Sequence, residues 1–386
     1  MATDPTEFWK QLSRARAAFL QGDTDASRAA FQQGQRALAT GDAMLDRQRQ
    51  LVLERSQQHF AGSGEASPDR TACLPAGPGP TVGETGGLSG NLAGNLIGAP
   101  SVATGKQQVF IDAQHGLGNR LRAIAAAASI AGKTDRELVI VWHPDAHCDC
   151  RFDDLFQYDG PVVSEPFIDT ARALGYRVYN YMEVEEGAEK DAPIDASGTA
   201  SLYIRSAYPL NAPEAVTAVE DRFLRRLDPV AEIRDMIASV RTPNDLSVHV
   251  RMQGGLAHEA LPYEAPENWT PEGRAQIDYW RGKSHYSNFF RRIDQLTDGA
   301  GIDRLFVAAD SQATYDAFLD RYGDRVAWLR RDVYDRSARQ LKYALADIYL
   351  LGHTRRMLGS SWSSFSDIAR RLSPNKLATE LSGKDF

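Results

Sequence analysis

The apolar residues after position 105 fall into short, nearly unbroken runs that are separated by longer amphipathic stretches. Six runs predict strands: QQVFIDA (107–113), ELVIVW (137–142), SLYIR (201–205), LSVHVRM (246–252), RLFVAAD (304–310) and VAWLR (326–330). Such runs are typical of parallel strands that are covered on both faces. Helical spacing lies between them, in RLRAIAAAASIAG, AVTAVEDRFLRRL, SNFFRRIDQL, QATYDAFLDRYG, ARQLKYALADIYLLGH and SFSDIARRL. The alternation predicts an α/β fold of one or two doubly wound units, with ligands at the carboxyl ends of the strands.

The first 105 residues have a different pattern. Residues 1–60 carry helix-spaced apolar positions interrupted by glycine, which predicts an N-terminal helical arm for self-association or for docking a partner. Residues 61–105 are rich in Gly, Pro, Ser and Thr and predict a flexible linker. The remaining chain divides near RTPND (241–245), so we expect one α/β domain over 106–243 and a second over 244–386.

Composition and charge limit the classes of partner and the compartment. The 386 residues include 44 basic and 51 acidic side chains, a net charge of −7, so no overall basic field favours nucleic acid. The longest run of small apolar residues, 123–132, is far shorter than the roughly 20 residues that cross a bilayer. The first ten residues lack the pattern of a signal peptide, and three cysteines are too few for a disulfide framework. We expect a cytoplasmic protein without a transmembrane segment.

A glycine-containing loop, QHGLGNR (114–120), lies between the first predicted strand and the helix that follows it. Two glycines allow a close approach of the backbone, and the amides of the helix face outward, which suits a phosphate or a sugar. The loop is not the dinucleotide-binding fingerprint, because Asn119 and Arg120 stand where that motif continues to a third glycine. A purely structural turn is the alternative. The candidate ligand-binding residues of the loop are His115, Gly116, Gly118, Asn119 and Arg120.

An arginine follows a histidine on the strand SVHVRMQGG (247–255). Alternation along a strand places His249 and Arg251 on one face, and the strand ends at a glycine pair. An arginine there can direct two hydrogen bonds at a diphosphate, which a lysine cannot reproduce. The alternative is a salt bridge between domains.

Four hydroxyl groups precede the last predicted helix in MLGSSWSSFSDIARRL (357–372). Hydroxyl groups and free amides at the start of a helix suit a phosphate, although a serine there also serves as an ordinary cap. Asp310, at the end of FVAAD, is a candidate acceptor for a base or ribose, or a cap for the next helix. The candidates in the serine segment are Ser360, Ser361, Ser363, Ser364 and Phe365.

Two further stretches invite an interpretation. WHPDAHCDCRFDDLF (142–156) gathers histidines and cysteines, but its compact spacing lacks the second ligand pair of a zinc module, so we predict no metal there. Residues 254–284 form a long polar and aromatic insertion after Arg251, which predicts a lid or a platform for the acceptor. Its Trp269, Tyr279 and Trp280 are candidates for stacking on sugars or for packing the loop down.

The order and spacing of HGLGNRLRA, HVR, FVAAD and DIYLLGHTRRMLGSSWSSFSDIARRL resemble the GDP-fucose-dependent fucosyltransferase superfamily over roughly residues 107–375. This superfamily includes protein O-fucosyltransferases, core α1,6-fucosyltransferases and the rhizobial nodulation fucosyltransferase. The resemblance implies a GT-B fold, in which two Rossmann-like domains face a cleft and the C-terminal one holds most of the nucleotide sugar. It also implies inversion at the anomeric carbon, with GDP-fucose as co-substrate and with neither a metal nor another cofactor.

The same resemblance assigns roles to residues of this chain. Arg251 matches the arginine that grips the β-phosphate of the donor. The loop of Gly116, Gly118 and Asn119 matches the loop that closes over donor and acceptor. Ser363, Ser364 and Phe365 match the Ser-Ser-Phe element that lies near the phosphates. Asp310 matches the acidic residue of the nucleotide domain.

One departure from the superfamily concerns the acceptor. The α1,6 enzymes continue the His-x-Arg pattern with Arg and then with Asp and Lys, whereas Met252, Gln253 and Gly254 follow here. This difference argues against an α1,6 core-type acceptor. The resemblance implies an acceptor hydroxyl on a glycan, a protein or a small molecule. Its proton goes to His115, whose ordinary pKa suits a base, or to the β-phosphate, in which case His115 is a structural hydrogen-bonding residue. The alternatives to this enzyme are a non-catalytic nucleotide-sugar-binding or scaffold protein and a transferase that uses another nucleotide sugar.

Overall fold

The computed structural model describes residues 106–252 and 271–386, apart from Pro166, Val184, Glu186 and Asn375, and also Ala29. The chain divides into two units after residue 93, and every described residue except Ala29 belongs to the second unit. The predicted helical arm, the predicted linker and the part of the insertion that holds Trp269 lie outside the described residues. Those predictions, and the domain limits that depend on them, stay predictions.

Five parallel strands form the first sheet, in the order β4-β2-β1-β6-β5. All six residues of the central strand are buried, as expected of a strand with neighbours on both sides and cover on both faces. The strands are β1 (Gln108–Ala113), β2 (Glu137–Val141), β4 (Val162–Val163), β5 (Arg177–Asn180) and β6 (Leu202–Ser206). The chain therefore enters the glycine loop at the middle of this sheet, from the carboxyl end of β1.

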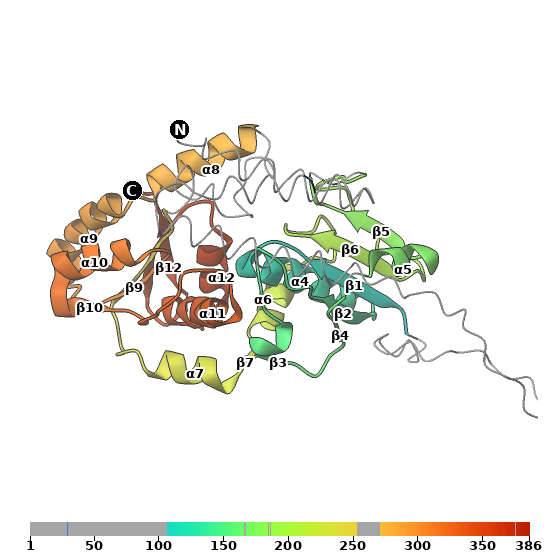
Figure 1. Ribbon diagram of the computed structural model, residues 1–386, viewed down its shortest axis with the longest axis horizontal. Helices are drawn as coiled ribbons and strands as arrows, with labels where there is room; N and C mark the ends of the chain where they lie inside the picture. Colours follow the sequence, from blue (N-terminus) through green and yellow to red (C-terminus); the bar gives the residue numbers. More distant parts are fainter. Residues whose placement is uncertain are drawn as a thin grey trace, which may run out of the picture. The chain divides into compact units, whose positions relative to one another are not determined.

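The helices of this part of the chain include α4, whose small residues allow close packing on the sheet (Figure 1). Alanines 123 and 125–127 of α4 are at most 1% exposed. The helices are α4 (Leu117–Lys133), α5 (Ile168–Ala173), α6 (Thr217–Leu224) and α7 (Ala231–Ala238). A short 3-10 helix, η1 (Phe152–Asp154), precedes β3 (Phe156–Gln157), which pairs antiparallel with β7 (Asp228–Pro229).

A second parallel sheet has the order β10-β9-β8-β11-β12, with β8 at its centre. Its strands are β8 (Leu246–Val250), β9 (Leu305–Ala309), β10 (Val326–Ala327), β11 (Arg356–Gly359) and β12 (Ala378–Leu381). The helices of this part are α8 (Pro271–Lys283), α9 (Tyr286–Ala300), α10 (Gln312–Tyr322), the 3-10 helix η4 (Gly323–Arg325), α11 (Ala338–Gly352) and α12 (Ser364–Leu372). Two doubly wound parallel sheets confirm the predicted α/β class (Figure 1).

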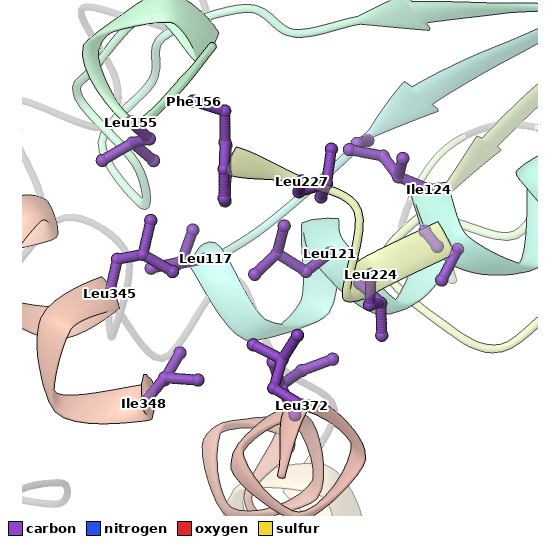
Figure 2. Close-up of a cluster of buried hydrophobic side chains, with 14 of the residues drawn as sticks. Leu117, Leu121, Ile124, Leu155, Phe156, Leu224, Leu227, Leu345, Ile348 and Leu372 are labelled. Carbon is purple, nitrogen blue, oxygen red and sulfur yellow. The ribbon is translucent and has the colours of Figure 1, made fainter. Parts of the chain in front are cut away.

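A continuous apolar core joins residues from both sheets. Figure 2 shows Leu117 and Leu121 of α4 directed toward side chains of α11 and α12, among them Ile348 and Leu372. A buried ion pair adds to this contact, because the Arg371 guanidinium of α12 lies 2.7 Å from carboxylates of Glu220 and Asp221. Burial of apolar side chains supplies the main stabilisation of such a contact. The two sheets are thereby held together through α4, α6, α11 and α12.

Several short elements were not predicted from the sequence, among them the edge strand β4 and the helices α5 and α7. The edge strands β5 and β12 were not predicted, because each has only four residues and mixes polar with apolar side chains. Residues 271–283 of the predicted insertion form helix α8, and its role as a lid or as an acceptor platform stays a prediction. Among the described residues, no helix combines the length and the apolar character that crossing a bilayer requires.

Candidate active site at the carboxyl ends of the two sheets

Arg251 follows the central strand of the second sheet, at the point where three strand ends meet. Its backbone N–H donates to the hydroxyl of Ser360 after β11, at 2.8 Å, and that hydroxyl donates to the carbonyl of His249, at 3.0 Å. The next N–H, of Met252, donates to the Asp310 carboxylate after β9, at 3.4 Å. The predicted arginine, serine and aspartate therefore come together at the carboxyl ends of β8, β11 and β9, where ligands of open α/β sheets bind.

Asp310 is not the cap of helix α10. The side chain of Ser311 accepts from the N–H of Thr314 and occupies that role. The Asp310 carboxylate instead turns toward the backbone at the end of β8. Of the two alternatives for Asp310, the structure excludes the capping one.

His249 is buried behind this corner. Its side chain is 5% exposed, its Nδ1 lies 2.7 Å from the hydroxyl of Ser366, and its ring stacks on Phe365 with centroids 4.6 Å apart. Burial, and then the positive charge of Arg251, lowers the pKa of His249 to about 3, so the ring is neutral near pH 7. The contacts of His249 with Ser366 and Phe365 hold the first turn of α12 against β8, and a contact between His249 and the donor stays a prediction.

The serine segment divides into buried and half-buried residues. Ser360 and Ser361 are at most 1% exposed, and the Ser361 N–H donates to the Ser382 hydroxyl at 3.3 Å. Ser360 acts on the backbone of Arg251, whereas a contact between the Ser361 side chain and the donor stays a prediction. Ser363 and Ser364 are half-buried at the start of α12, where the Ser363 side chain makes no capping hydrogen bond. These two hydroxyls lie at the positive end of the helix dipole.

The glycine loop meets the serine segment through Gly118. A Cβ atom at Gly118 would lie 2.7 Å from the Ser364 hydroxyl oxygen and 3.1 Å from the backbone nitrogen of Phe365. The absence of a side chain thus lets α4 and α12 approach. Gly116 is the N-cap of α4, with ordinary space around its Cα, and the Asn119 side-chain oxygen accepts from Arg122 at 3.1 Å. The two predicted loops therefore lie against each other.

His115 has a left-handed backbone, with φ +62°, at the mouth of α4. Its half-buried ring lies 4.9 Å from the ring of His147 and 6.2 Å from that of Tyr208. Burial lowers the pKa of His115, the charge of Asp145 opposes this, and Arg120 contributes to the lowering. A neutral imidazole next to the glycine loop is able to accept a proton.

Arg120 is bound by the two loops at this edge of the first sheet. Its side chain is fully buried, donates to the carbonyls of His115 and His143, each at 2.8 Å, and pairs with Asp145. The loops before α4 and after β2 thus take up the polar groups of Arg120, and its predicted donor-binding role stays a prediction.

The sequence did not single out four charged residues beside this loop. Arg205, at the end of β6, pairs with the buried Asp112 at 2.6 Å and with Glu185 at 2.8 Å. Arg336 reaches the loop from the other sheet, and its Nη1 lies 3.9 Å from the place of a Cβ at Gly116. Arg205 ends a predicted strand, which is a usable signal, whereas Arg336 follows no regular element.

The histidine and cysteine segment after β2 is mostly buried. The Cys148 and Cys150 sulfur atoms lie 3.8 Å apart, and the carbonyl of Cys150 accepts from the Trp142 indole at 2.9 Å. Within the described ranges, no three His, Cys, Asp or Glu side chains are grouped so as to hold a metal ion. Whether the reaction requires a metal stays a prediction.

Comparisons with known proteins gave matches among solved structures only. No protein-family model matches the chain, and no curated protein matches it. The structure is similar to the fucosyltransferase NodZ from Bradyrhizobium, at 18% identity and a TM-score of 0.46, with 70% of this chain and 94% of that chain covered. It is also similar to POFUT1 without ligand, at 14% identity and a TM-score of 0.44, with 74% of this chain and all of that chain covered. At these values the similarity assigns neither a substrate nor the role of any residue to this chain.

Proposed function

We propose that this protein is a glycosyltransferase that moves fucose from GDP-fucose to an acceptor hydroxyl, with inversion and without a metal. One observation carries the proposal: the carboxyl ends of both sheets meet where Gly118 lies against Ser364, with Arg251 and Ser360 behind. Arg251, two hydroxyls and a helix N-terminus lie at the end of the second sheet, and the glycine loop with the neutral imidazole of His115 lies at the end of the first. This is the set of groups that diphosphate departure and proton removal need.

In the proposed reaction the acceptor oxygen forms a bond to the anomeric carbon. The bond between that carbon and the β-phosphate oxygen breaks, and its electron pair leaves with GDP. Arg251 and the first amides of α12 offset the charge that develops on the diphosphate. The hydroxyl proton passes to the neutral ring of His115 and from there to water. Removing one preorganised donor of this kind costs about 3 kcal/mol of transition-state stabilisation.

The choice of donor rests on the motifs. The loop QHGLGNR, the strand SVHVR and the segment GSSWSSF resemble those of GDP-fucose-dependent fucosyltransferases. NodZ, described as an α-1,6-fucosyltransferase, has been soaked with GDP-fucose, and POFUT1 is known in complex with GDP-fucose. We therefore propose GDP-fucose rather than a uridine or thymidine donor.

The first experiment measures nucleotide binding and donor turnover. We expect GDP to raise the melting temperature in the presence of EDTA, and UDP and dTDP to leave it unchanged. Incubation with GDP-fucose should release GDP, and Arg251→Ala should reduce that rate about a hundredfold or more while the protein stays folded. Arg355→Ala is the control, because Arg355 is exposed and precedes β11, at the amino edge of the same sheet.

The outcomes separate the alternatives. Stabilisation by UDP or dTDP, but not by GDP, would indicate a different donor. Binding of GDP with no release from GDP-fucose, alone or with a panel of acceptors, would indicate a non-catalytic nucleotide-sugar-binding protein. Near-normal turnover of the Arg251→Ala protein would reject the role of this arginine.

A further inference from the structure

Arg120 is a fully buried arginine whose contacts all converge on the loops that carry two histidines. Its Nε donates to the carbonyl of His115 and its Nη1 to the carbonyl of His143, both at 2.8 Å. Its Nη2 lies 2.8 Å from the Asp145 carboxylate, and its guanidinium carbon lies 4.8 Å from the centre of the Trp142 ring. The planar guanidinium thus makes two hydrogen bonds to carbonyls, an ion pair with a carboxylate and a contact with the face of an indole ring. Lysine cannot reproduce this geometry.

The bond to the His115 carbonyl acts on a strained residue. A non-glycine residue with φ +62° costs free energy, so the surrounding contacts must hold it in place. Arg120 follows His115 by five residues, on the first turns of α4, and reaches back to that carbonyl. The direction of the His115 side chain therefore depends on the Arg120 guanidinium.

The same guanidinium also fixes the second histidine, through Asp145. One oxygen of the Asp145 carboxylate pairs with Arg120, and the other accepts the backbone N–H groups of His147 and Cys148, at 2.8 and 3.0 Å. The His147 ring in turn lies against the His115 ring, with centroids 4.9 Å apart. A single buried cation thus sets the positions of both imidazoles.

We propose that Arg120 is a positioning residue, which holds the His115 imidazole where it takes the proton of the acceptor hydroxyl. This inference rests on the proposed function, because it gives His115 a role only if a hydroxyl is deprotonated there. A ring nitrogen of His115 receives the proton, and the hydroxyl oxygen keeps its electron pair and bonds to the anomeric carbon. Arg120 itself exchanges no proton and touches no substrate.

The surroundings of His115 are mixed in charge. Asp145 and Glu185 favour the protonated ring, Arg120 and Arg205 disfavour it, and the rings of His147 and Tyr208 lie beside it. Burial is the largest influence and lowers the pKa of His115. A change that keeps the charge of residue 120 but releases the loop should therefore expose the ring and raise its pKa toward the ordinary value of about 6.5.

The chain offers a matched control in Arg136. This arginine is 5% exposed and also donates to backbone carbonyls, those of Ala196, Gly198 and Ala200. It precedes β2, at the amino end of the first sheet, and holds no histidine. Arg120→Lys and Arg136→Lys thus make the same chemical change in two buried arginines, only one of which is attached to His115.

The experiment follows GDP release from GDP-fucose with water as acceptor, GDP binding by calorimetry, and the titration of His115 by NMR. His115→Gln should reduce GDP release about a hundredfold. Arg120→Lys should reduce it at least about tenfold, with the dissociation constant for GDP changed less than about twofold. The double variant should be no slower than His115→Gln, since Arg120 acts through that ring. Arg136→Lys should keep the wild-type rate and the wild-type titration of His115.

The results decide the proposal even if the proposed reaction fails. Additive losses in the double variant, or equal losses from Arg136→Lys, would overturn it. If the wild type neither binds GDP nor releases it from GDP-fucose, the proposed function fails. The positioning role is tested separately, and an unchanged titration of His115 in Arg120→Lys would overturn it. Where Arg120→Lys does not fold, Arg120→Met fills the buried space with an apolar side chain and should show the same loss of turnover.

Discussion

Gly118 is the position where the contact between α4 and α12 tolerates the least change. Gly118→Ala would place a methyl group 2.7 Å from the Ser364 hydroxyl oxygen, 3.0 Å from the Ser364 carbonyl carbon and 3.1 Å from the Phe365 nitrogen. The hydroxyl is able to rotate away, but the two backbone atoms belong to the first turn of α12. The two helices must therefore separate by a few tenths of an ångström.

The expected magnitude follows from two opposing effects. Forcing a methyl group into a packed contact costs about 1–3 kcal/mol. Alanine is the better helix former by about 1 kcal/mol in a helix interior, and by less at the second residue of α4. We expect Gly118→Ala to lower the free energy of unfolding by about 1–2 kcal/mol and to weaken GDP binding, because the glycine loop and the serine segment move apart.

Gly132→Ala, in the same helix, is the matched control. No atom lies within 4 Å of a Cβ at Gly132, so only the gain in helix propensity remains, up to about 1 kcal/mol. Urea unfolding of both variants, at constant m-value, measures the difference of about 2 kcal/mol. Adding Ser364→Ala to Gly118→Ala should recover only part of the loss, because the backbone contacts persist. A Gly118→Ala protein as stable as Gly132→Ala would refute the packing role of this glycine.

Two further predictions concern buried charge and acid stability. Arg371→Ala removes one partner of a buried ion pair, in which the arginine side chain is only 5% exposed, and should lower the free energy of unfolding in urea by about 3 kcal/mol. Arg370→Ala, at the exposed neighbouring position, should lower it by less than about 0.5 kcal/mol. Burial in the folded state lowers the pKa of His249 to about 3, so the unfolded state takes up a proton at this residue first as the pH falls. The free energy of unfolding is therefore highest above pH 6.5 and decreases as the pH drops toward 3. At pH 5 the loss is about 2 kcal/mol. The free energy of unfolding of His249→Gln should therefore change less between pH 7 and pH 5 than that of the wild type, by about 2 kcal/mol. His143→Gln, at an exposed position, should match the wild type.

The main features of the fold follow from apolar patterning. The run at 107–113 became β1, that at 246–252 became β8, and the helix expected over 338–353 became α11, each within two residues of its predicted limits. The run at 326–330 shortened to the two residues of β10. Edge strands such as β12 escaped prediction, because a strand that is half covered needs no continuous apolar run.

The site was only partly predictable, for a physical reason that the arginines illustrate. Arg251 follows a central strand, so its place at the carboxyl edge of the sheet is fixed by local sequence. The orientation of Arg120 depends on the carbonyl of His143 and on the Asp145 carboxylate, which lie more than twenty residues away. Spacing along one helix gives no information about partners at that distance. The same limit hid the approach of Arg336 to the glycine loop.

Two buried arginines fix the elements that carry the candidate site. Arg371 ties α12 to α6 through two carboxylates, and Arg120 ties the start of α4 to the loop after β2. Each arginine places a charge in the protein interior. Burial of that charge is less favourable than burial of an apolar side chain unless every polar partner is in place. Arginine meets this condition with donors in fixed directions, so displacement of a single partner leaves a buried charge unsatisfied. The Arg371 ion pairs resist separation of α12 from α6, on which α4 packs, and Gly118 allows the close contact between α4 and α12.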